Sequence, residues 1–118
     1  MEEPTTTTTT SSPGPSLLQK CAAEAIGTGM IVGGGCGAVC SAMYVPGYAL
    51  GPLGVSLAFG ASVALAVYST RDISGAHLNP AITAAVALNR PGAMTREEMI
   101  GYPLAQITGA AIAAVRST

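Results

Sequence analysis

Two long apolar stretches dominate the first part of the chain. One runs from about Cys21 to Val45 and the other from about Leu50 to Thr70, and Tyr68 is the only ionisable side chain in the second. A helix needs about 17 to 25 residues to cross the hydrocarbon core of a bilayer, so both stretches are long enough. The pattern predicts two transmembrane helices, over residues 21–45 and 50–70.

A third apolar stretch follows after a more polar interval. It runs from Met99 to Val115, between Glu98 and Arg116, and its length is at the short end of the spanning range. Thr95 and Glu98 have the sequence spacing of a capping box at the start of a helix. We therefore expect a third transmembrane helix over residues 96–115.

Small residues recur at helical spacing in all three stretches. Residues i and i+4 lie on the same face of a helix, and small side chains there let two helix backbones approach closely. The pattern predicts that the helices pack on one another. The residues concerned are Gly29, Gly33 and Gly37 in the first stretch, Gly60 and Ala64 in the second, and Ala105, Gly109 and Ala113 in the third.

A shorter apolar segment, from Pro80 to Asn89, lies between the second and third stretches. At about 1.5 Å per residue a helix of this length reaches about 15 Å, half of the hydrocarbon thickness, so it cannot cross. Asn79 is a favourable N-cap residue, and Pro80 suits the first helical position because no N–H is needed there. The segment has no polar face for lying on the membrane surface. We expect a half-helix over residues 79–89 whose amino end lies inside the bilayer.

The residues just before this half-helix must then lie deep in the membrane without helical structure. Irregular backbone is tolerated at that depth only where it is buried in protein or lines a water-filled cavity. We therefore expect a pore, in which the carbonyl groups of Gly75, Ala76 and His77 form a ladder of acceptors. The positive end of the half-helix and the Asn79 amide would act as donors. Water can use both, whereas a cation meets an electrostatic barrier.

Composition agrees with a membrane protein and excludes other classes. Only 9% of the residues are charged, whereas about a quarter are charged in a typical soluble domain. The net charge is −1 and the basic residues are scattered singly, so there is no basic stripe for nucleic acid. The sequence shows neither a pair of nucleophile and base nor paired carboxylates, so nothing in it indicates an enzyme. Cys21, Cys36 and Cys40 have no partner at metal-ligand spacing, so we expect packing cysteines, no metal site and no cofactor.

Charge placement orients the chain. Lys20 precedes the first stretch, and Arg71, Arg90 and Arg96 lie between the second and third, whereas the connection between the first two has no charge. The positive-inside rule then places the N-terminus on the cytoplasmic side. We expect a multi-pass integral membrane protein of the plasma membrane. Residues 1–16, which are rich in Thr, Ser and Pro, are expected to form a disordered tail.

The sequence resembles the major intrinsic protein family, which includes the aquaporins and aquaglyceroporins. The segment SGAHLNPA is similar to the first Asn-Pro-Ala signature of the family in its full context, and AEAIGTGM, GVSLAFGASVA and AQITGAAIAA are similar to its first three helices. The resemblance covers about Cys21 to Val115. It implies that residues 17–118 form an aquaporin-like N-terminal repeat with Asn79, Pro80 and Ala81 as the pore signature.

The implied fold is an all-α membrane protein with three transmembrane helices and one re-entrant half-helix, half of a right-handed bundle. The implied function is a passive channel for water, with glycerol or other small neutral solutes as further candidates. The resemblance also implies a homo-oligomer, a tetramer in the family. Lipid surrounds such a protein.

The resemblance assigns roles to polar side chains near the pore. It implies that Glu24 and Gln106 brace the re-entrant loop through hydrogen bonds. A buried carboxylate is costly in hydrocarbon, so Glu24 must face donors or water; the alternative is a lone anchor near the interface. The resemblance also implies that His77 contributes its carbonyl to the pore and its side chain to the bracing of the loop.

Phe59 is the candidate selectivity residue. It stands at the position that contributes an aromatic wall to the narrowest ring in family members. A Phe there resembles water-selective members, whereas glycerol facilitators tend to carry Trp. The alternative is that Phe59 packs against lipid or a neighbouring helix.

The sequence departs from the family in one respect. Family members contain two inverted repeats that meet at the midplane of the membrane. This sequence has no second Asn-Pro-Ala and no selectivity Arg in a second re-entrant loop. Three interpretations stay open: a truncated water channel, a half-channel that assembles with another half, and a non-conducting subunit that associates with full-length channels and modulates their assembly.

Overall fold

The computed structural model describes residues 13–47 and 50–116, and this part of the chain is helical, with no strand. The expected all-α fold is therefore confirmed for the described residues. Most of the expected tail, residues 1–12, lies outside them. The elements are α1 (Leu17–Ile31), the π-helical turn η1 (Val32–Cys36), α2 (Gly37–Tyr44), α3 (Gly51–Ser74), α4 (Pro80–Asn89) and α5 (Arg96–Arg116).

Two helices are long and apolar enough to cross a membrane. They are Leu17–Tyr44, which consists of α1, η1 and α2 in one continuous run, and α3, which covers Gly51–Ser74. In contrast, α5 carries Arg96, Glu97 and Glu98 in its first turn and Arg116 in its last. Its 21 residues are long enough, but it does not meet the hydropathy that the two long helices reach. The third transmembrane helix stays a prediction.

Both long helices extend further than their apolar patterns. The first begins at Leu17 rather than at Cys21, because Ser16 caps it: its hydroxyl accepts from the Gln19 N–H at 3.3 Å, and the Gln19 side chain accepts from the Ser16 N–H at 2.8 Å. The second continues past Thr70 to Ser74. Gly75 then ends it with a φ of +89°, in the left-handed region that glycine adopts without steric cost. The apolar patterns stop short of these ends because the end turns of both helices contain polar residues.

The first long helix contains a wide π-helical turn at Val32–Cys36, which the sequence pattern did not predict. Such turns occur mostly as single interruptions of α-helices, frequently at functional sites. Three successive glycines, Gly33 to Gly35, occupy it. In this wider turn both Gly34 and Gly35 face α3, since a Cβ at Gly34 would collide with Ser62 and one at Gly35 with Phe59.

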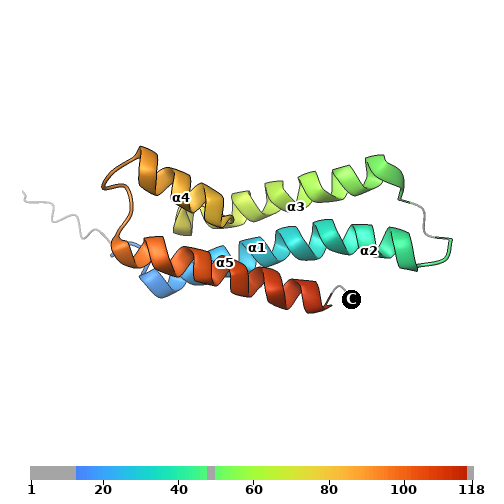
Figure 1. The fold of residues 1–118 in the computed structure, drawn as a ribbon, viewed down its shortest axis with the longest axis horizontal. Coiled ribbons are helices and arrows are strands. Elements are labelled where there is room, and N and C mark those ends of the chain that lie inside the picture. The colour runs from blue at the N-terminus through green and yellow to red at the C-terminus, as the bar shows by residue number, and fades with distance from the viewer. Residues whose placement is uncertain (1–12, 48–49, 117–118) are drawn as a thin grey trace, which may run out of the picture.

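The helices form an elongated bundle (Figure 1). α1 packs on both α5 and α3, and α4 lies over α5 at the end of the bundle where α1 begins. The α1–α5 contact depends on Gly109, because a Cβ there would collide with the backbone of Ala25. Close packing of backbones at small residues is the usual way that helices associate in membranes.

Buried polar residues outnumber buried apolar ones in the described part of the chain. The buried apolar residues are Ala23, Ala66, Leu78 and Tyr102, whereas Glu24, Thr28, Thr70, Ser74, Thr83, Glu98 and Gln106 are buried and polar. Large apolar side chains instead cover the outside of the helices. A soluble domain has the reverse distribution, with apolar side chains inside and polar ones outside. The buried polar groups lie around the segment between α3 and α4.

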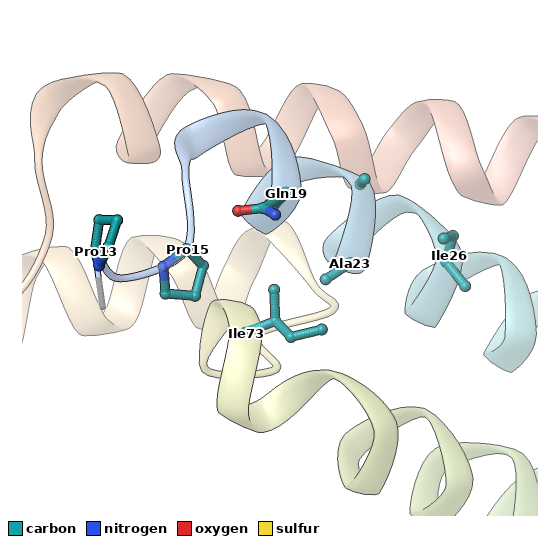
Figure 2. Close-up of a pocket in the computed structure, with 7 residues that line it drawn as sticks. Pro13, Pro15, Gln19, Ala23, Ile26 and Ile73 are labelled. Carbon is teal, nitrogen blue, oxygen red and sulfur yellow. The ribbon is translucent and has the colours of Figure 1, made fainter. Parts of the chain in front are cut away.

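An apolar cavity of about 470 Å³ opens beside the start of α1. Figure 2 shows Ile73, from the end of α3, pointing toward Ala23 on α1, with Pro13 and Pro15 at the other end of the cavity. Gln19 is the one long polar side chain among the residues that line it. The cavity brings together no group that could carry out chemistry, so the candidate site lies elsewhere.

Candidate functional site

The segment between α3 and α4, residues 75–79, is a loop with unusual backbone conformation. Gly75, Ala76 and Leu78 have φ values of +89°, +52° and +53°. A residue other than glycine in the left-handed region costs about 1–3 kcal/mol and persists only where the surrounding structure holds it. Ala76 and Leu78 therefore require contacts from elsewhere in the protein.

Glu24 on α1 supplies such a contact to Leu78 directly, and to Ala76 through the hydroxyl of Ser74. Its side chain is 0% exposed. One carboxylate oxygen accepts from the Ser74 hydroxyl at 2.6 Å and the His77 N–H at 3.0 Å. The other accepts from the Leu78 N–H at 2.6 Å and the Gln106 amide at 2.7 Å. An ionised carboxylate can accept about four hydrogen bonds, so these donors use its full capacity.

Two of these donors are successive backbone N–H groups, from His77 and Leu78. Backbone that alternates between right- and left-handed conformations turns neighbouring N–H groups toward one point and forms a concave site for an anion. Here the anion is the side chain of Glu24. Among the described residues no cation pairs with Glu24, so hydrogen bonds alone compensate for its burial.

The hydrogen bonds of the loop are strongly one-sided. The Gly75 N–H donates to the carbonyl of Arg71 at 3.0 Å, and the Ala76 N–H donates to the Ser74 hydroxyl at 3.2 Å. The His77 N–H donates to Glu24, so the N–H groups of Gly75, Ala76 and His77 are all satisfied by the protein. The carbonyl oxygens of the same residues accept no hydrogen bond within the described part of the chain. Gly75, Ala76 and His77 therefore turn their donors inward and leave their acceptors free, whereas the carbonyls of Leu78 and Asn79 accept from Thr28 and Thr83.

A cavity of about 510 Å³ lies against these residues. Its lining includes Gly75, Ala76 and His77 from the loop and Ile82 and Val86 from α4. Gly75 is exposed, and Ala76 and His77 are half-buried. A molecule in this cavity meets the loop and one face of the short helix.

Asn79 joins the loop to α4. Its backbone is extended, with φ −155° and ψ 128°, and its side-chain oxygen accepts from the Ala81 N–H at 2.9 Å. Pro80 occupies the first helical position. The amide nitrogen, bonded to the same carbon as this oxygen, donates no hydrogen bond to the described residues, and Asn79 is exposed. The start of α4 thus presents a donor two residues after the last of the free carbonyls.

Residues from α5 hold the loop from the other side. Gln106 is 0% exposed and donates to both Glu24 and the Thr83 hydroxyl, the latter at 3.1 Å. This leaves the Gln106 side-chain oxygen as the buried side-chain polar atom without a partner in the described residues. The Tyr102 hydroxyl donates to the carbonyl of Ser74 at 2.8 Å, and its ring meets His77 edge-on at 5.4 Å.

The resemblance implied bracing roles for Glu24, Gln106 and His77. The structure places all three around the loop, with His77 Nδ1 3.2 Å from the hydroxyl of Thr83, and their roles stay a prediction. Sequence reasoning missed four further residues of this network: Thr28, Ser74, Thr83 and Tyr102. Two signals were visible, because Thr28 stands one helical turn after Glu24 and Tyr102 one turn before Gln106.

Phe59 does not join this network. It lies on α3 fifteen residues before Ser74, or about 22 Å along the helix. Its ring is half-buried and its edge packs on Gly35 of η1. The structure thus separates the candidate selectivity residue from the candidate pore loop.

A charged contact ties the starts of α1 and α5 together near the site. Lys20 Nζ lies 2.6 Å from Glu98 Oε1. The other oxygen of Glu98 accepts from the Thr95 N–H at 2.9 Å, and the Thr95 hydroxyl accepts from the Glu98 N–H at 3.2 Å. The expected capping box at the start of α5 is therefore present.

Within the described residues, no group of three or more His, Cys, Asp or Glu is arranged to hold a metal ion.

Comparisons with known proteins identify relatives of this chain. It is 43% identical over 98 residues to aquaporin Z of Photorhabdus laumondii, a match that covers 83% of this chain and 42% of the relative. It is 44% identical over 97 residues to aquaporin Z of Bradyrhizobium diazoefficiens, covering 82% and 40%, and 41% identical over 98 residues to aquaporin Z of Brucella melitensis, covering 83% and 42%. The chain spans about two fifths of the length of these relatives.

The family model for major intrinsic proteins matches residues 11–116, which is most of the chain. Family members are channels and not enzymes. The match agrees with the two long apolar helices. The chain is a membrane protein that belongs to the major intrinsic protein family.

Proposed function

We propose that this chain forms one half of a transmembrane channel for water, in which residues 75–79 line the pathway. The observation that carries the proposal is the one-sided hydrogen bonding of Gly75, Ala76 and His77: their N–H groups are satisfied by the protein, whereas their carbonyl oxygens accept no hydrogen bond from the described residues. Free carbonyls are not tolerated against lipid, so they require water or another donor. The relatives named aquaporin Z support the same function.

The start of α4 complements these acceptors. Asn79 and the positive end of the helix offer donors, so a water molecule on the proposed pathway passes from acceptors at the loop to donors at Asn79. A cation at Asn79 faces the positive end of the helix dipole. Small neutral solutes with hydroxyl groups, such as glycerol, have the same hydrogen-bonding groups as water. Their passage depends on the width of the constriction, where we place Phe59.

The second half of the pathway comes from outside the residues described. The cavity beside the loop is bounded by the loop and α4, and another element must face them to close a pore. A second repeat of the family type, in the same polypeptide or in another chain, is the proposed partner. We further propose assembly into a homo-oligomer.

Basic residues orient the proposed channel. Lys20, Arg71, Arg90 and Arg96 all belong to the end of the bundle where α1 and α5 begin and α3 ends (Figure 1). The positive-inside rule assigns this end to the cytoplasm, with the N-terminus. We propose the plasma membrane as the location.

A chimera tests the proposal. Residues 17–116 replace the corresponding part of aquaporin Z from Photorhabdus laumondii, and stopped-flow light scattering measures osmotic water permeability in proteoliposomes. We expect permeability well above that of empty vesicles. Glu24→Leu should abolish it, whereas the matched control Glu97→Leu, at an exposed glutamate in the first turn of α5, should retain it.

A chimera that inserts at a normal level but conducts no more water than empty vesicles would contradict the channel function. Co-purification of the present chain with full-length aquaporin Z, combined with a non-conducting chimera, would instead favour a subunit that modulates assembly.

A further inference from the structure

Gly35 of η1 and Phe59 of α3 are in close contact. Three atoms on one edge of the Phe59 ring lie so near Gly35 that a Cβ on that residue would be closer than 3.0 Å to each of them, a separation that real Cβ atoms do not show. Gly35 is buried, whereas Phe59 is only half-buried. The ring therefore rests with one edge on the backbone of η1, and part of it stays exposed.

The π-helical turn creates this resting place. Gly34 and Gly35 are consecutive, yet a Cβ on either would meet α3, at Ser62 and Phe59 respectively. The neighbouring Gly33 differs, because the nearest atom to a Cβ added there would be the Cβ of Ala113 on α5, at an ordinary distance of 3.9 Å. The space for the ring is thus specific to one position.

We infer that Gly35 is a positioning residue that sets the place of the Phe59 ring and, through it, the width of the constriction. The inference rests on the proposed function, in which Phe59 forms one wall of the pore. It adds a residue that does not itself line the pathway. A methyl group at Gly35 would push the ring on the order of 1 Å away from η1, because carbon atoms in contact stay about 3.5–4.0 Å apart.

The single Phe of the sequence permits a direct test of this contact. The chain is labelled with 4-fluorophenylalanine and reconstituted in lipid nanodiscs, and its ¹⁹F resonance is compared among variants. Gly35→Ala should move the resonance clearly, whereas the control Gly33→Ala should leave it nearly unchanged. Equal shifts in the two variants, or no shift in either, would overturn the inference.

Water permeability tests the consequence, in the chimera with aquaporin Z described above. Gly35→Ala should lower water permeability roughly threefold or more, because a small change in the narrowest ring strongly affects passage. Gly33→Ala should not. In a Phe59→Leu background, which removes the ring edge, Gly35→Ala should have little effect on permeability or on the yield of folded protein.

The outcomes separate the two proposals. An equal loss of permeability from Gly35→Ala with Phe59 present and in the Phe59→Leu background would show a general packing role and overturn the inference, while the channel function stands. A chimera without any water permeability would overturn the channel function and the role of Gly35 in pore width together. The ¹⁹F comparison would then still report whether Gly35 positions the ring.

Discussion

The carboxylate of Glu24 and the backbone N–H of Leu78 are joined by a hydrogen bond of 2.6 Å across 54 residues of sequence. Leu78 has a φ of +53°, a conformation that a branched side chain adopts only under constraint. A charge on α1 thus holds a strained residue in the loop between α3 and α4. The conformation of the loop depends on this long-range contact more than on its own sequence.

Replacing Glu24 by Gln should destabilise the protein strongly. One carboxylate oxygen becomes an NH₂ group that faces N–H or O–H donors, so at least one buried donor loses its acceptor. We expect a loss of about 3 kcal/mol or more, since breaking a buried charged network costs this much. Thermal unfolding in detergent, followed by circular dichroism, measures it. Glu97→Gln is the control, and an equal effect of the two substitutions would contradict the role of Glu24.

Tyr102→Phe should cost about 1 kcal/mol, the usual net contribution of one hydrogen bond. The substitution removes the donor to the carbonyl of Ser74 and keeps the ring contact with His77. Tyr68→Phe is a matched control, because Tyr68 is 75% exposed on α3. Thermal unfolding of both variants under one condition measures the difference. Equal midpoints would show that the Tyr102 hydroxyl does not stabilise the loop.

Lys20→Gln should lower stability in a way that depends on salt. The ion pair between Lys20 and Glu98 is partly accessible to solvent, with side chains 29% and 11% exposed. We expect a loss of about 1 kcal/mol at low ionic strength and a smaller one in high salt, where solvent-exposed charges are screened. Unfolding at two salt concentrations tests this. A loss that stays constant with salt would indicate packing by the lysine stem instead.

Gly109→Ala should separate α1 from α5. A Cβ on Gly109 would overlap the backbone of Ala25, which cannot move aside as a flexible side chain can. Overpacking of this kind costs about 1–3 kcal/mol or more, so we expect a low yield of folded protein. In contrast, a Cβ added at Gly60 would have no atom within 4 Å. Gly60→Ala should therefore leave the stability of the protein unchanged or raise it, because alanine favours the helix. Size-exclusion profiles and unfolding midpoints compare the two. Equal behaviour would contradict the close approach of the helices.

Local signals made parts of the fold predictable. Asn79 and Pro80 form a strong helix start, and α4 begins at Pro80 with Asn79 as its cap. Thr95 and Glu98 predicted the capping box that α5 shows. Each of these signals depends on residues within one helical turn, so sequence spacing alone reveals it.

Other features depend on distant contacts and could not be predicted from local patterns. Ser74 and Tyr102 are 28 residues apart, and nothing in either segment indicates their hydrogen bond. The π-helical turn at Val32–Cys36 lies in a glycine run that is equally compatible with a regular helix. The ends of the long helices were misplaced because Lys20 and Arg71 interrupt the apolar pattern but not the helix.

Because the N–H groups of Gly75, Ala76 and His77 point into the protein, a molecule that contacts this part of the loop can only donate hydrogen bonds to it. Gly75, Ala76 and His77 present oxygen only, so a water molecule that touches them points its hydrogens to the wall. In the proposed channel, its orientation is then set before it reaches Asn79. A chain of waters held in one direction cannot reverse freely, and relaying a proton along it requires that reversal.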